Sequence, residues 1–107
     1  MRNEIPPGTL DMLILKTLLA TEMHGFEIAE AIRRTSEDVL HVEEGSLYPA
    51  LHRLEEGGCV RARWCKTENN RRARVYEITA SGRKQLQAEE TRWTSITAAI
   101  NQVLKQA

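Results

Sequence analysis

The main concentration of positive charge in the chain lies between residues 61 and 74. It holds one carboxylate, Glu68, and its cations are Arg61, Arg63, Lys66, Arg71, Arg72 and Arg74. Guanidinium and ammonium groups bind phosphate oxygens, so a concentrated basic segment is typical of a surface that contacts nucleic acid. Residues 1–45 are acidic, and the formal net charge of the whole chain is zero. The sequence therefore predicts a local phosphate-binding surface on a neutral protein.

The other residue types that can do chemistry show no grouping of this kind. Cys59 and Cys65 lack the spacing of a zinc knuckle, and His24, His41 and His52 are scattered. No nucleophile–base pair and no phosphate-cradling glycine loop is visible, although distant residues can still assemble a site in space. We expect no metal, no cofactor and no enzymatic activity. Unligated cysteines are the favoured interpretation because a cytosolic pair is usually reduced, and a redox role stays open.

The length and composition suit one small domain. The 107 residues are 41% hydrophobic and 28% charged, which is ordinary for a soluble globular protein. No stretch approaches the ~20 consecutive apolar residues that span a membrane. The apolar run near the N-terminus carries Asp11 and Lys16, so we interpret it as an amphipathic helix and not as a signal peptide. The expected location is the cytoplasm, with no membrane partner.

Apolar periodicity predicts three short helices in the first half of the chain. The first two cover residues 10–21 and 25–34. Ser46 is expected to cap the third, with Pro49 in its first turn and two glycines at its end. The residues expected to face the core are Leu10, Leu13, Ile14, Leu18, Ile28, Ala29, Ile32, Leu47, Leu51 and Leu54. Three short helices of this kind suggest a helix-turn-helix.

The next segment changes its period from that of a helix to that of a strand. Residues 60–65 and 75–78 each alternate between apolar and polar side chains. A polar stretch over residues 67–73 separates the two runs, and Asn69-Asn70 supplies residues that tolerate a positive φ at its tip. The pattern predicts a β-hairpin, and a hairpin that follows a helix-turn-helix is a wing.

A long helix is expected at the end of the chain, over about residues 80–105, with Thr79 as its cap. Its apolar stripe, which Glu89 interrupts, and the second apolar side of the first helix are expected to face another subunit. The predicted homodimer interface is Leu15, Leu19, Leu86, Trp93, Ile96, Ile100 and Val103. The fold class that follows is mainly α with a small β-hairpin. A winged helix-turn-helix covers residues 1–79, and a dimerisation helix, continuous with it, covers residues 80–107.

Three blocks of sequence stand out as motifs. They are His24-Gly25-Phe26-Glu27-Ile28, Gly45-Ser46-Leu47-Tyr48-Pro49-Ala50-Leu51-His52-Arg53-Leu54-Glu55 and Tyr76-Glu77-Ile78-Thr79-Ala80-Ser81-Gly82. Together they resemble the PadR family of bacterial transcriptional regulators, over essentially the whole chain, and the single C-terminal helix is similar to the compact subfamily. The resemblance implies a winged helix-turn-helix, a homodimer built from the first and last helices, and usually repression at an inverted repeat. Phe26 stands where the family usually has tyrosine, and Asn69-Asn70 stands where many relatives have glycines.

The third helix and the wing carry the candidate contacts to double-stranded DNA. The predicted set is Ser46, Tyr48, His52 and Arg53 of the helix and Arg71, Arg72 and Arg74 of the wing tip. Recognition helices meet base edges in the major groove, and wing cations reach the backbone or the minor groove. Three of these residues have structural alternatives: Ser46 as a plain N-cap, Tyr48 packed against the wing, and Arg53 paired with a carboxylate. Arg61 and Arg63 suit a DNA contact and an ordinary solvated face equally well.

The predicted function is sequence-specific DNA binding by a homodimeric transcriptional repressor. The alternative is a winged-helix module whose basic wing binds an acidic protein surface. In some compact PadR relatives, a tryptophan at the matching place on the last helix lines a pore that takes flat aromatic molecules. That resemblance implies a small aromatic effector stacked on Trp93. Packing in the dimer core is the favoured alternative, because aromatic residues at helical spacing usually pack.

Overall fold

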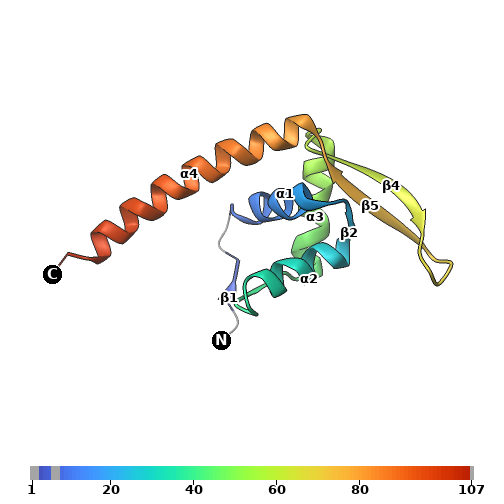
Figure 1. Ribbon diagram of the computed structural model, residues 1–107, viewed down its shortest axis with the longest axis horizontal. Helices are drawn as coiled ribbons and strands as arrows, with labels where there is room; N and C mark the ends of the chain where they lie inside the picture. Colours follow the sequence, from blue (N-terminus) through green and yellow to red (C-terminus); the bar gives the residue numbers. More distant parts are fainter. Residues whose placement is uncertain (1–2, 6–7, 107) are drawn as a thin grey trace.

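The computed structural model describes residues 3–5 and 8–106, which form helices and a small sheet whose hairpin projects from one side of them (Figure 1). The helices are α1 (Leu10–Ala20), α2 (Gly25–Thr35), α3 (Glu44–Glu56) and α4 (Ala80–Leu104). The hairpin strands are β4 (Val60–Lys66) and β5 (Arg72–Ile78), and the two-residue strands are β1 (Asn3–Glu4), β2 (Met23–His24) and β3 (Leu40–His41). The predicted fold class is confirmed, because a hairpin follows three short helices and precedes a long one.

The hairpin belongs to a three-stranded antiparallel sheet with the order β2-β5-β4. Its register runs from Val60 opposite Ile78 at the base to Lys66 opposite Arg72 near the tip. Residues 67–71 close the turn, and Asn70 there has a φ of 61°, in agreement with the residue type expected at the tip. Strand β2 lies outside the prediction, because two residues are too few to show an alternation.

Helix α1 is the centre of the core and packs against α2, α3, α4 and β5. The side chains of Ile14 and Leu15 have no exposed surface. The other core residues are Met12, Leu18, Ile28, Ile32, Leu47, Ala50, Leu51, Leu54, Cys59, Val60, Tyr76, Ile78 and Leu86. The expectation that the second side of α1 faces another subunit was therefore wrong for Leu15, since elements of its own chain cover it. Leu19, which is 42% exposed, is the large apolar side chain of α1 that stays open to solvent.

Helix α4 has one half in the fold and one half outside it. The hydroxyl of Thr79 accepts a hydrogen bond from the Gly82 amide at 3.0 Å, so the predicted cap is confirmed. Leu86 is buried in the core, and Lys16 of α1 pairs with Glu90 at 3.3 Å. Beyond that point α4 extends away from the other elements as an arm (Figure 1). The exposed apolar residues of this arm are Trp93, Ile96, Ile100, Val103 and Leu104.

Helix α3 begins earlier than the sequence suggests. Its N-cap is Glu43 and its first residue is Glu44, so Ser46 lies inside the first turn and is not the cap. Pro49 consequently falls in the second turn, where it cannot donate the helical hydrogen bond to the Gly45 carbonyl. Serine is a good cap by residue type, but this first turn is exposed, and water can satisfy its free amides without a side chain.

Candidate nucleic-acid interface

The register of the hairpin sorts its side chains onto two faces. Paired residues share a face, and successive residues along a strand alternate between faces. One face therefore carries Val60, Ala62, Trp64 and Lys66 with their partners Ile78, Tyr76, Arg74 and Arg72. Near the base this face is buried in the core, and toward the tip it opens to solvent. The open part, which consists of Trp64, Lys66, Arg72 and Arg74, is called the inner wing face below.

Arg74 joins the inner wing face to α3. Its Nη2 atom lies 2.8 Å from Oε2 of Glu55 in α3. Its guanidinium also lies 5.5 Å from the centre of the Trp64 ring and 5.9 Å from that of Tyr76. The prediction that Arg74 lies at the wing tip was wrong, because Arg74 pairs with Trp64 inside the hairpin, whereas the last pair before the turn is Lys66 with Arg72. Arg74 therefore fixes the wing against the helix.

The opposite face of the hairpin, the outer wing face, carries Arg61 and Arg63, and both are paired with carboxylates of this chain. Arg61 Nε lies 3.4 Å from Oε1 of Glu77 across the hairpin. Arg63 pairs with Glu22, the residue that precedes β2. Of the two interpretations of these arginines, the geometry favours an ordinary solvated face, since their charges are already balanced.

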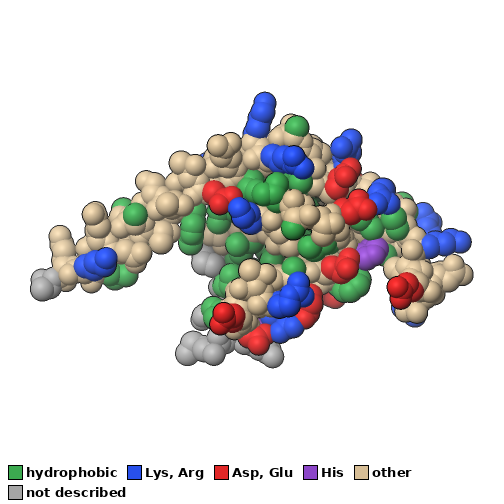
Figure 2. All heavy atoms as spheres, viewed as in Figure 1, with side chains coloured by type: hydrophobic (Ala, Val, Ile, Leu, Met, Phe, Trp, Pro, Cys, Tyr) green, Lys and Arg blue, Asp and Glu red, His purple; other side chains and the backbone are tan. Residues whose placement is uncertain are grey.

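Lys66, Arg71 and Arg72 form the free end of the wing and are called the tip cations. Within the part of the chain that the structure describes, none of the three forms an ion pair. The Arg72 guanidinium lies 4.7 Å from the centre of the Trp64 ring. Lysine and arginine side chains gather around the wing at the right of Figure 2. Such cations can bind phosphate without first breaking an ion pair.

Four of the predicted DNA-contacting residues are exposed on α3, namely Ser46, Tyr48, His52 and Arg53. His52 Nε2 lies 3.1 Å from Oε1 of Glu56, and Arg53 Nη2 lies 3.1 Å from Oδ1 of Asp11. Of the two interpretations of Arg53, pairing with a carboxylate is thus the one found in the free protein. Exposed pairs of this kind contribute little to stability, so a base edge or a phosphate can replace the carboxylate at small cost.

Tyr48 is held by the start of α2. A Cβ atom at Gly25 would come within 2.7 Å of the ring atom Cε1 of Tyr48, so the ring needs a glycine beneath it. The ring of Tyr48 therefore packs against the start of α2, an element that the alternative drawn from the sequence did not name. The neighbouring residue Phe26 is exposed and stacks on His24, with ring centres 5.8 Å apart.

The buried polar groups near this surface have structural roles. Burial raises the pKa of the Cys59 thiol, and the nearby carboxylates of Glu89 and Asp11 raise it further. The thiol donates to Oε1 of Gln85 at 2.9 Å. Burial likewise raises the pKa of the Tyr76 hydroxyl. A thiol with a raised pKa is a poor nucleophile, so Cys59 acts as a packing residue here.

Among residues 3–5 and 8–106, no group of three or more histidine, cysteine or acidic side chains is arranged to hold a metal ion. Within the same ranges, no helix combines the length and the apolar character that a membrane crossing requires.

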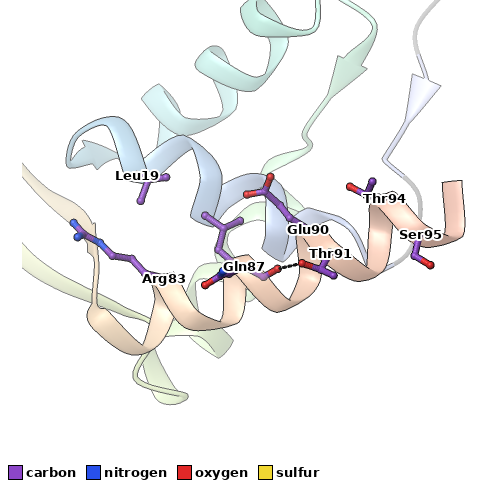
Figure 3. Close-up of a pocket in the computed structure, with 8 residues that line it drawn as sticks. Leu19, Arg83, Gln87, Glu90, Thr91, Thr94 and Ser95 are labelled. Carbon is purple, nitrogen blue, oxygen red and sulfur yellow. Dashed lines mark hydrogen bonds between the residues drawn. The ribbon is translucent and has the colours of Figure 1, made fainter. Parts of the chain in front are cut away.

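An open groove of about 670 Å³ lies between the end of α1 and the middle of α4 (Figure 3). Its lining residues are Leu19, Arg83, Leu86, Gln87, Glu90, Thr91, Thr94 and Ser95. Trp93, the residue predicted to stack on an aromatic effector, is not among them. Leu19 and Leu86 are the apolar residues of this lining, and the other lining residues are polar side chains of α4. The groove borders the exposed arm.

Trp64 is the member of this surface that sequence reasoning missed. It alternates in phase with Val60 and Ala62, which suggests an inward, buried side chain. The structure leaves it 57% exposed, because the hairpin extends beyond the helices that cover its base. The length of the hairpin could have revealed this exposure, because Trp64 lies too far from the base for a small core to cover it.

Comparison with known proteins gives the family. The profile of the transcriptional regulator PadR-like family matches residues 14–88. A transcriptional regulator from Clostridium thermocellum is 30% identical, with a TM-score of 0.84 over 92% of this chain and 95% of that chain. A PadR family transcription regulator from Clostridium difficile is 28% identical, with a TM-score of 0.78 over 91% of this chain and 99% of that chain. An uncharacterised protein of Lysinibacillus sphaericus is 26% identical over 94% of this chain and 93% of its own length. The chain belongs to the transcriptional regulator PadR-like family.

Proposed function

We propose that the chain is a sequence-specific repressor that binds an inverted-repeat operator as a homodimer. The observation that carries this proposal is the 2.8 Å contact between Glu55 and Arg74, which makes the outer side of α3 and the inner wing face one continuous surface. A recognition helix beside a cation-bearing hairpin fits a major groove and its flanking backbone. The predicted cytoplasmic location goes with this proposal, since a repressor works where the chromosome lies.

The two parts of the surface have different tasks in this proposal. Ser46, Tyr48, His52 and Arg53 of α3 meet base edges and the adjacent phosphates. The tip cations bind the backbone beyond the half-site, where contact fixes position but carries no sequence information. Arg74, which Glu55 already neutralises, is a positioning residue that holds the two parts together.

The homodimer is supported by the arm of α4. Trp93, Ile96, Ile100 and Val103 follow one another at helical spacing, and all four are exposed in the single subunit. A helix of 25 residues with an open apolar stripe gains most of its stability by packing against a second helix. With Leu19, these four residues are the interface that we propose. Leu15 and Leu86 leave the predicted set because they are buried within their own subunit. Sedimentation at micromolar concentration tests the proposal, and a well-folded monomer would contradict it.

A selection experiment tests the DNA-binding part. Wild-type protein is used to enrich duplexes from a random-sequence library, and the enriched sequences should share two symmetric half-sites about one helical turn apart. Affinity for the enriched duplex should fall steeply with added salt, because bound cations release counterions. The second candidate is a module whose tip cations bind an acidic protein. No enrichment, together with weak and equal binding to all duplexes, would favour that candidate.

Two roles are open for Trp93 within this proposal. It packs in the centre of the dimer, or it stacks on a planar aromatic effector that shifts the spacing of the two reading heads. Packing is favoured, since Trp93 lies on the same stripe as Ile96 and Ile100. Titration with planar aromatic compounds in a Trp64→Phe background follows Trp93 fluorescence alone. Quenching that saturates and weakens DNA binding would support the effector.

A further inference from the structure

Trp64 is a large apolar ring that the fold places in the open. It is 57% exposed, whereas its neighbours toward the base on the same face, Val60 and Tyr76, are 1% and 6% exposed. The indole N–H donates to no acceptor within the described part of the chain, so its donor is available to a ligand. Because the ring is largely exposed, it adds little buried apolar surface to the hairpin. Its position therefore needs another explanation.

The cations around Trp64 indicate what kind of partner the ring fits. Arg74 lies on one flank and is fixed by Glu55, while Arg72 lies 4.7 Å from the ring centre and has no carboxylate partner among the described residues. Lys66 follows on the same strand face. An apolar ring with unpaired cations beside it matches the backbone of DNA, in which apolar sugar edges alternate with charged phosphates.

We propose that Trp64 is a DNA-contacting residue whose indole packs against a deoxyribose of the backbone that the wing follows. Arg72 binds the adjoining phosphate, and the indole N–H donates to a phosphate oxygen. This inference rests on the proposed function and assigns to the wing an apolar contact besides its charges. Because sugar and phosphate are the same in every sequence, the contact adds affinity and not sequence preference.

A purely structural role is the alternative that the experiment must separate. A ring beneath two guanidinium groups stabilises a hairpin through cation–π attraction, and such a ring need never touch DNA. That role predicts a loss of thermal stability in Trp64→Ala and no change in the surroundings of the ring when DNA binds.

The test uses full-length protein labelled with 5-fluorotryptophan and the duplex that wild-type protein enriches from a random library. The chain has two tryptophans, so the fluorine spectrum has two resonances, and the one missing from Trp64→Phe belongs to Trp64. Saturating duplex should shift this resonance and remove its solvent isotope shift. A Trp64 resonance that keeps its position and its isotope shift at saturation would overturn the inference.

Affinity measurements complete the test. Trp64→Ala should weaken binding about tenfold, the size of one aromatic contact to nucleic acid, and equally on the enriched and an unrelated duplex. Trp64→Phe, which keeps a ring, should lose less, and it serves if the alanine variant unfolds. Cys65→Ala, one residue away on the outer wing face, is the matched control and should bind as wild type does. Unchanged affinity in both Trp64 variants would overturn this inference alone, whereas a wild-type protein that binds no duplex would also overturn the proposed function.

Discussion

The base and the tip of the wing carry the same residue types and use them differently. At the base and along the middle of the hairpin, Arg61 and Arg63 are paired with Glu77 and Glu22, and Arg74 is paired with Glu55. At the tip, Lys66, Arg71 and Arg72 form no ion pair with a described residue, because the hairpin there projects beyond the helices (Figure 1). Cations within one basic run therefore differ in what binding costs them, because only the unpaired ones can bind phosphate without first giving up a partner.

A substitution between α4 and the base of the hairpin should cost the most stability. Gly82→Ala would place a Cβ atom 2.1 Å from the Cys59 carbonyl oxygen and 2.8 Å from Ile78, so α4 must move off the hairpin. We expect a loss of about 3 kcal/mol in the free energy of unfolding, measured by urea titration. Gly45→Ala in α3 is the matched control, since nothing lies within 4 Å of a Cβ there. Equal stability of the two variants would contradict the close packing of α4 on the base.

Removing two positive charges should matter at the tip and not on the outer wing face. The double variant Arg71→Ala, Arg72→Ala should weaken binding on all duplexes by about tenfold or more, and each lost phosphate contact should lower the salt slope by about 1. The matched control is Arg61→Ala, Arg63→Ala, which makes the same charge change in the same hairpin. Fluorescence anisotropy at several salt concentrations measures both. If the two double variants lose the same affinity, net charge and not position governs binding.

The wing and α3 should respond differently to the loss of a single side chain. Arg53→Ala or His52→Ala should change the preference among base sequences by about 1 kcal/mol, because base contacts and not phosphate contacts discriminate. Asp11→Asn, which releases Arg53 from its partner without removing it, should preserve that preference. A repeat of the library selection with each variant measures the change. Recovery of the wild-type sequence by Arg53→Ala and His52→Ala would count against α3 as the reading element.

Two buried groups near the base, Cys59 and Tyr76, should give stability a weak dependence on pH. Burial raises the pKa values of Cys59 and Tyr76 from their ordinary values of 9.0 and 10.0. Above about pH 9 the unfolded chain loses protons that the folded chain keeps, so the free energy of unfolding should fall as pH rises. Below that pH both states hold these protons, and neither group contributes a slope. Urea unfolding across alkaline pH measures the fall, which Cys59→Ala and Tyr76→Phe should each make shallower. An identical slope in all three proteins would show that other groups cause it.

Much of the fold could be predicted from local sequence patterns. The boundaries of α1, α2 and α4 fall within about two residues of the prediction, because apolar spacing and end signals such as the Thr79 cap act over a few neighbouring residues. The start of α3 could not be predicted in this way, since two glutamates, a glycine and a serine at residues 43–46 offer several starts of similar merit. In the fold this first turn is exposed, so water can satisfy its free amides and a start without a capping side chain is tolerated.

The family, the winged helix-turn-helix and the local excess of positive charge could all be inferred from the sequence, because motifs, periodicity and charge are properties of neighbouring residues. Which charges are unpaired depends on the packed fold. Asp11 reaches Arg53 across 42 residues, and Glu22 reaches Arg63 across 41. The same packing buried Leu15 and left Trp64 open, although both belong to apolar patterns. Whether a side chain is covered or paired depends on segments far away in the chain, and short-range patterns carry no record of them.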